Sequence, residues 1–244
     1  MDMILLDWTR MGRAYCIAGA VWQDQQWRIV RPLLTNFRQG PVRTVGWSAY
    51  LLDGHVRWEI MELIGPQPAT PEPPHVEDLW VRSLRFRGAT ASLEQRRAIL
   101  TTTLPRAGES LFGSDLATTR TAVYQRPGTG ARSLATLLVP SDSIHFVGVW
   151  REGCAEPDIR ASLTLPDWGN RSLPVKDHHL LRKAEQAGPD IEQRIQFLTA
   201  AVQRMGDPVA VRLGLSRPFV GRSDLPGMCW VMADGFFSLM DPQP

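Results

Sequence analysis

The sequence predicts a mainly β protein with a few helices, built as two small β-barrels in tandem. Short segments in which apolar and polar residues alternate recur in both halves of the 244-residue chain. Helix signals are confined to two segments, and a loop-rich stretch separates the halves. We therefore expect a first barrel over residues 1–85, an irregular connector with a short helix over 86–132, and a second barrel over 133–244.

The composition indicates a folded protein outside the membrane. Hydrophobic residues make up 43% of the chain and charged residues 21%, which is ordinary for globular proteins. The longest apolar runs are far shorter than the ~18 residues that cross a bilayer. The opening MDMILLDWTR lacks the basic start and cleavage site of a signal peptide, so we expect a cytoplasmic protein with no membrane partner. Three widely spaced cysteines predict buried thiols rather than a zinc site.

Strand signals fill the first half. Residues 4–8 (ILLDW) and 13–22 (RAYCIAGAVW) are followed by a polar QDQQ turn into 27–33 (WRIVRPL), which predicts a meander of at least three strands. Alternation returns over 55–63 (HVRWEIMEL). The prolines of 65–74 (GPQPATPEPP) exclude a helix and a central strand, so we expect this segment to lie as a strap across the surface.

The connector and the second half each carry one helix signal. The short helix is expected over 92–104, with Ser92 as a possible N-cap. The longer helix is expected over 190–206, with Asp190 as its N-cap and Gln193 in the capping-box position. Strand patterns of the second half cover residues 133–140, 144–150, 158–165, 172–177, 209–216 and 229–239. Strands interrupted by one helix suit a small Greek-key barrel capped by a helix, which is the architecture of an OB-fold.

Several stretches, in this order, resemble one known family. They are GRAYCIAG (12–19) with WRIVRP (27–32), LLDGHVRWEIMELIGPQPATPEPPHVEDLW (51–80), IRASLTLPDWGNRSLPVKDHHLL (159–181) and VRLGLSRPF (211–219). In these stretches the chain resembles the dual OB domain-containing proteins of bacteria. The resemblance implies two OB-like barrels and a role in nucleic-acid transactions, in the setting of mobile elements or phage defence. It implies no reaction and no catalytic residues, and the opening LLDWTRMGRAYC is less rich in lysine than the family pattern.

Basic residues are almost all arginine. The formal net charge is only +2, which is too small to predict binding to a polyanion by itself. Lys176 and Lys183 are the only lysines among the 27 basic residues. Arginine binds phosphate through two parallel hydrogen bonds and stacks on bases. A GC-rich genome would produce the same excess of arginine over lysine. Only the positions of the arginines can therefore indicate whether they bind nucleic acid.

Strand register predicts outward-facing arginines and aromatic rings, the groups with which OB barrels bind single strands. We expect Arg212 on the outer face of its strand, and Arg31 and Arg217, which each precede a proline, at the barrel rims. The alternatives are a solvated sheet face, or an Arg31 that caps a barrel end or pairs with Asp7 or Asp53. The predicted nucleic-acid-binding residues are Arg13, Tyr15, Arg28, Arg31, Arg160, Trp168, Arg171, Lys176, Arg212, Arg217 and Phe219.

The predicted function is non-catalytic binding of single-stranded or otherwise exposed DNA or RNA, without a cofactor or metal. Residues 177–179 (DHH) lack the further ligands of a metal site, and 128–130 (GTG) lacks the following Gly-Lys-Ser/Thr of a P-loop. No partner histidine is assigned to Cys16 or Cys154 as a nucleophile. Two other classes stay open: an accessory subunit that uses its nine tryptophans and the strap to contact a larger complex, and a small-molecule sensor in a barrel mouth.

Overall fold

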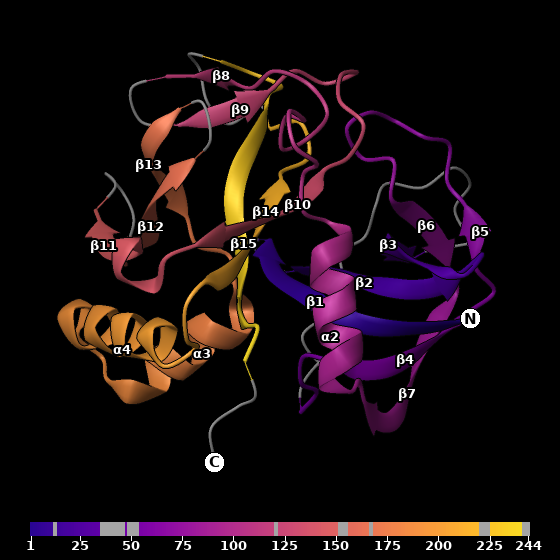
Figure 1. The fold of residues 1–244 in the computed structure, drawn as a ribbon, viewed down its shortest axis with the longest axis horizontal. Coiled ribbons are helices and arrows are strands. Elements are labelled where there is room, and N and C mark those ends of the chain that lie inside the picture. The colour runs from indigo at the N-terminus through magenta and orange to yellow at the C-terminus, as the bar shows by residue number, and fades with distance from the viewer. Residues whose placement is uncertain are drawn as a thin grey trace.

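The computed structural model describes residues 1–11, 14–34, 47, 54–119, 122–150, 156–165, 168–219 and 225–240. Within these ranges the chain is mainly β and has three α-helices, so the predicted fold class is confirmed. The strands of each part of the chain form a curled half-barrel, consistent with tandem OB-like barrels (Figure 1). The domain boundaries expected near residues 85 and 133 stay a prediction.

The first half-barrel is a seven-stranded sheet in the order β5-β6-β3-β2-β1-β4-β7. The predicted meander is its centre, and Asp24 and Gln25 form the hairpin turn between β2 and β3 with positive φ angles of 51° and 60°. Its strands are β1 (Asp2–Met11), β2 (Ala14–Gln23), β3 (Gln26–Leu34), β4 (Glu59–Ile64), β5 (Gln67–Pro68), β6 (Asp78–Val81) and β7 (Ser83–Thr90). Most residues of the proline segment 65–74 are exposed, as expected for a strap.

The second part of the chain contains a five-stranded sheet in the order β10-β14-β15-β9-β8 and a three-stranded sheet in the order β11-β12-β13. Its strands are β8 (Ala117–Thr118), β9 (Val123–Gln125), β10 (Leu134–Val139), β11 (His145–Val149), β12 (Asp158–Leu165), β13 (Gly169–Pro174), β14 (Val209–Leu215) and β15 (Cys229–Ser238). A single 3-10 turn, η1 (Ser141–Ser143), precedes β11. Each strand segment predicted for this half is present.

Two of the three helices are the predicted ones. Helix α2 (Leu93–Thr102) begins at Ser92, whose side chain accepts from the Gln95 backbone N–H in a complete capping box. Helix α4 (Ile191–Gln203) begins after Asp190 as predicted and ends three residues early. It packs on β11, where a Cβ added to Gly148 would lie 2.7 Å from Ile191 Cγ1.

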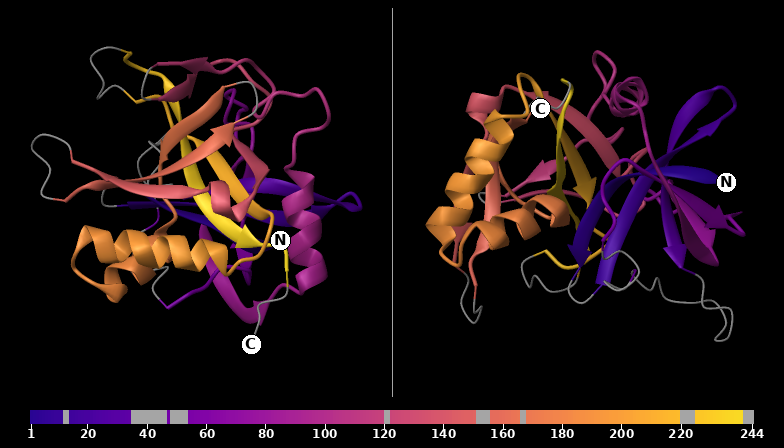
Figure 2. Two further views of the ribbon diagram at one scale, coloured as in Figure 1. Left: turned by 60° about the vertical axis from the view of Figure 1, so that its left-hand side comes forward. Right: turned by 90° about the horizontal axis from the view of Figure 1, so that it is seen from below.

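Helix α3 (His178–Ala187) was not predicted. Asp177 is its N-cap, and the carboxylate accepts from the backbone N–H of Leu180 at 2.8 Å. The DHH motif is therefore the start of a helix. Helices α3 and α4 lie side by side at one end of the second half (Figure 2). None of the helices in the described ranges is long and apolar enough to span a membrane.

Strand β1 is buried on both faces, because the two halves of the protein share it. Met3 and Leu5 pack in the core of the first sheet. Ile4 and Leu6 point the other way into a second cluster that contains Phe237 of β15. A strand buried on both faces needs a continuous apolar run rather than alternation, which is what MILL supplies.

Candidate nucleic-acid interface

Arg212 lies inside the protein, so the prediction that it faces outward is wrong. Its Nη2 donates to Asp7 Oδ2 at 2.7 Å, and its Nε lies 3.2 Å from both Asp7 oxygens. Its Nη1 donates to Thr103 Oγ1 at 2.7 Å. Every residue of β14 is buried, because this strand lies between the two halves. Arg212 therefore neutralises a carboxylate from the other half of the chain.

The prediction that Arg31 emerges at a barrel rim is also wrong. Its exposed fraction is 4%, and its Nη2 donates to Ser133 Oγ at 2.8 Å. Its Nη1 lies 2.7 Å from His75 Nδ1, which accepts because arginine always carries its protons. The alternative that Arg31 pairs with an aspartate holds, but the partner among the described residues is Asp78, at 3.8 Å, rather than Asp7. Asp7 is engaged by Arg212, and Asp53 lies outside the described residues.

Four further basic residues of the predicted site have partners of their own. The pairs are Arg28 with Asp24 at 2.8 Å, Arg160 with Ser172 at 3.0 Å, Lys176 with Asp158 at 3.5 Å, and Arg217 with Asp78 at 2.6 Å. Arg28 lies on the seven-stranded sheet and Arg160 on the three-stranded sheet, whereas Arg217 follows β14. These side chains therefore do not form the continuous outer track that the sequence predicts.

The other predicted residues are dispersed as well. Tyr15 is half-buried, with its ring 4.7 Å from the ring of His178, and Trp168 packs against the core of the second half. Arg171 is paired with Leu163 across β12 and β13, and its Nη1 donates to the Asn170 carbonyl at 3.0 Å. Phe219 is exposed, and Arg13 lies outside the described residues. Among the three aromatic residues of the predicted site, Phe219 is exposed, whereas Tyr15 and Trp168 are partly buried.

A cysteine and a histidine come together without forming a nucleophile. Cys229 Sγ lies 4.0 Å from His75 Nε2. Burial raises the pKa of the Cys229 thiol, and burial together with Arg31 and Arg217 lowers the pKa of His75 to about 2. Both groups are therefore neutral near pH 7, whereas nucleophilic chemistry needs a thiolate. Burial also raises the pKa of Cys16, and Cys154 lies outside the described residues.

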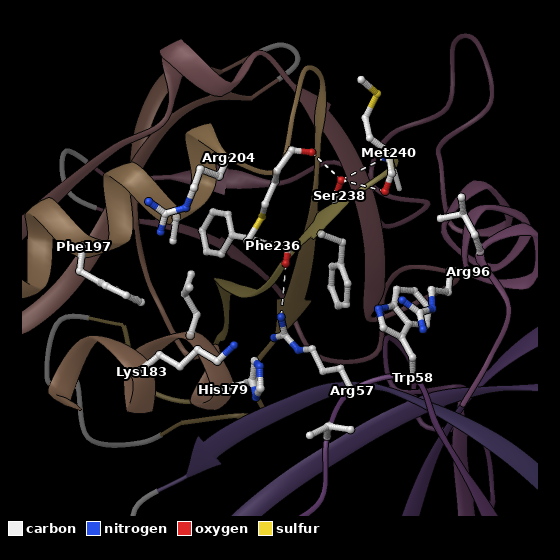
Figure 3. Close-up of a pocket in the computed structure, with 16 residues that line it drawn as sticks. Arg57, Trp58, Arg96, His179, Lys183, Phe197, Arg204, Phe236, Ser238 and Met240 are labelled. Carbon is white, nitrogen blue, oxygen red and sulfur yellow. Dashed lines mark hydrogen bonds between the residues drawn. The ribbon is translucent and has the colours of Figure 1, made fainter. Parts of the chain in front are cut away.

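Basic and aromatic side chains gather instead in a pocket between α2, α3, α4 and the end of β15 (Figure 3). We call it the α2–α4 pocket; its cavity volume is about 550 Å³. None of the residues that line it is acidic. The basic lining residues are Arg57, Arg96, His179, Lys183 and Arg204, and the aromatic ones are Trp58, Phe197, Phe236 and Phe237.

The local sequence explains how two of these groups share one face. The Asp177 cap fixes the start of α3, and His179 and Lys183 follow four residues apart on the same side of that helix. Arg57 reaches the pocket floor from the loop before β4. Its Nη2 lies 2.6 Å from Asp177 Oδ1, and its Nη1 donates to the Phe236 carbonyl at 3.3 Å. Arg57, from the first half, therefore links the floor of the pocket to the second half of the protein.

The lining of the pocket carries positive charge from its arginine and lysine residues, of which Arg57 is paired with Asp177. Burial, then the charges of Arg57 and Lys183, lower the pKa of His179 to about 4, so this ring is neutral near pH 7. Arg96 lies over the Trp58 ring, 5.5 Å from its centroid. In the part of the chain that the structure describes, neither Lys183 nor Arg204 has an ion-pair partner. These two cations are therefore available to a ligand.

Sequence reasoning missed the principal members of this pocket. Lys183 was passed over because α3 was not predicted, and Arg204 because it caps the end of α4 rather than lying on a strand. The available signal was the spacing of His179 and Lys183 after a capping aspartate. Trp58, which also lines the pocket, is buried.

Comparisons with known proteins add little. No protein-family profile matches the sequence, and no curated protein matches it. A solved structure described as a murine DNA binding protein bound with double-stranded DNA shares 10% sequence identity with this chain. The match covers 96% of this chain and 98% of that one, with a TM-score of 0.28. A TM-score this low carries no argument about fold or function. Within the described ranges, no cluster of histidine, cysteine and carboxylate residues could hold a metal ion.

Proposed function

We propose that this protein binds single-stranded or otherwise exposed nucleic acid without catalysing a reaction on it, and that the α2–α4 pocket is the main contact. The observation that carries the proposal is the lining of this pocket, which contains four arginine and lysine side chains, of which Arg57 is paired with Asp177, and no acidic side chain. Phosphate contacts supply most of the affinity of a nucleic-acid-binding protein, and rings beside them give bases a stacking surface.

The pocket supports this function better than the arginines predicted from the strands. Arg212 already donates to the buried carboxylate of Asp7. It is not available to an external phosphate, because binding one would leave that carboxylate buried without a partner. Lys183 and Arg204 carry no such cost. Membership of the dual OB domain-containing family, with its setting in mobile-element or phage-defence systems, stays a proposal based on the sequence stretches given above.

Fluorescence polarisation with single-stranded DNA and RNA oligonucleotides tests the proposal across a salt series. We expect binding at ~50 mM salt that weakens steeply as salt rises, since phosphate contacts release counterions. Arg204→Gln should weaken binding, whereas Arg126→Gln removes the same charge from an exposed residue outside the pocket and should not. No binding to either polymer at ~50 mM salt would defeat the proposal. An equal loss of binding affinity in the two variants would show that the main contact lies outside the pocket.

A second candidate, an accessory subunit of a larger complex, is favoured by the edge strand β11. Val147 and Val149 are exposed on this strand, and the exposed fraction of Trp150 directly after it is 66%. Apolar side chains that stand together on a surface often mark a protein interface. A partner that co-purifies in fixed stoichiometry with the wild-type protein, and is lost on Trp150→Asp, would favour this candidate if nucleic-acid binding is absent.

A further inference from the structure

We infer that the α2–α4 pocket takes one nucleotide that carries a phosphate monoester, with the phosphate at Lys183 and the base against Phe197. This inference rests on the proposed function, because it assigns the ligand of the same pocket. Two sources share that chemistry: the phosphorylated end of a strand, and a free mononucleotide.

The size of the pocket favours a single nucleotide. Its volume of about 550 Å³ lies within the range of cavities that enclose one small ligand. A strand that runs along an OB barrel occupies roughly 4–16 nucleotides in an open groove. The floor here is closed by Phe236 and by Arg57, which is anchored to Asp177 (Figure 3). The pocket therefore suits a nucleotide that ends in it better than a strand that passes through it.

The charge of the pocket favours a monoester over a diester. Lys183 on α3 and Arg204 at the end of α4 are two cations without an ion-pair partner in the described ranges. A phosphate monoester carries a charge of about −1.5 to −2 at pH 7, whereas a bridging phosphodiester carries only one negative charge. The doubly charged group is attracted more strongly by the positive charge of the lining, so a terminal phosphate gains more from this pocket than an internal one.

The floor of the pocket supplies a donor that the protein itself does not use. The Arg57 side chain is more than nine-tenths buried, and its Nε has no hydrogen-bond partner among the described residues. A buried donor without an acceptor is unfavourable. The Nε atom is enclosed by the protein, so a phosphate oxygen reaches it only when the lining shifts, while the two Nη atoms stay bonded to Asp177 and to the Phe236 carbonyl. Figure 3 shows the ends of Lys183, His179 and Arg57 gathered on one side of the pocket. Because the His179 ring is neutral near pH 7 and Arg57 is paired with Asp177, Lys183 is the cation of this corner that has no ion-pair partner among the described residues.

One aromatic side chain of the pocket is placed to contact a base. Trp58, Phe236 and Phe237 also line the pocket, but each of these residues is at most 9% exposed. Phe197 on α4 is only half-buried, so part of its ring faces the pocket. Stacking on a phenyl ring tolerates any base, because every base has a flat π-face. We therefore expect selectivity for the phosphate rather than for the base.

The test compares oligonucleotides that differ only at one end. Fluorescence polarisation uses a 12-nucleotide strand labelled at its 3′ end with a 5′-phosphate or a 5′-hydroxyl, and the reverse pair labelled at its 5′ end with a 3′-phosphate or a 3′-hydroxyl. We expect one phosphorylated end to bind at least tenfold tighter than its hydroxyl counterpart. Lys183→Gln should abolish this preference and Arg126→Gln should keep it. Both residues are exposed, so the two variants should unfold at the wild-type temperature.

Competition and calorimetry distinguish the two sources and separate this inference from the proposed function. Adenosine monophosphate should displace the strand at least tenfold better than adenosine; displacement as strong as that by a phosphorylated strand identifies a free nucleotide as the ligand. Binding of adenosine monophosphate by titration calorimetry, without binding of any oligonucleotide, would sustain the pocket assignment and defeat the polymer function. Oligonucleotides that bind equally well with and without end phosphates would sustain the function and overturn this inference. An equal loss of the preference for the phosphorylated end in Lys183→Gln and Arg126→Gln would overturn the inference as well.

Discussion

The buried ion pair between Asp7 and Arg212 predicts a large loss of stability when one partner is removed. Arg212→Met removes every hydrogen bond that the guanidinium gives Asp7, and leaves a carboxylate that is only 2% exposed. Breaking a buried pair by deleting one partner typically costs about 3–5 kcal/mol. The free energy of unfolding of a domain is typically about 5–15 kcal/mol, so this one substitution removes a substantial part of it.

Urea unfolding followed by tryptophan fluorescence measures this loss. Arg28→Met serves as the control, because Arg28 and Asp24 form an exposed pair whose contribution is about 0–1 kcal/mol. The double variant Asp7→Leu with Arg212→Met should be more stable than Arg212→Met alone, since it leaves no buried charge without a partner. The reasoning is refuted if Arg212→Met lies within ~1 kcal/mol of the wild type, the range of an exposed pair.

Three further predictions concern local features. Ser92→Ala removes the cap of α2 and should lower the free energy of unfolding by about 1 kcal/mol in the same assay; an unchanged urea midpoint would contradict it. Gly19→Ala would place a Cβ 2.4 Å from the Ile4 carbonyl oxygen, and should cost about 1–3 kcal/mol by forcing β1 and β2 apart. A wild-type thermal midpoint would show that the strands adjust freely. Burial, then Asp7, raise the pKa of Asp234 to about 8, so the folded state holds a proton that the unfolded state releases above about pH 4. The wild type should therefore lose stability relative to Asp234→Asn as pH rises from 4 to 8, by up to about 1.4 kcal/mol per pH unit; parallel pH profiles would exclude this.

Local patterns in the sequence predicted the strands and two helices because their causes are local. Alternation over β12 and the cap of α2 at Ser92 each depend on residues within one segment. Helix α3 was not predicted because residues 177–179 (DHH) were considered only as a metal site, which was rejected, and because its surface is polar, although Leu180 and Ala184 are buried.

Long-range pairing decided what the sequence did not predict. An arginine between apolar residues is compatible with an outer face or with a buried pair, and the carboxylate that decides the matter for Arg212 lies 205 residues away. Arg31 likewise finds Ser133 across 102 residues. The α2–α4 pocket has the same origin, since Arg57, Lys183 and Arg204 come from separate segments that only the folded chain brings together.

The position of β1 between the halves has a consequence for the protein during its synthesis. Asp7 leaves the ribosome 205 residues before Arg212, and translation at about 5–20 residues per second makes that interval roughly 10–40 s. Throughout that time the apolar face of the first sheet that later packs against Phe237 is exposed to solvent. Chaperones that bind emerging apolar chain are thus expected to cover this face of the first sheet until β15 has been made.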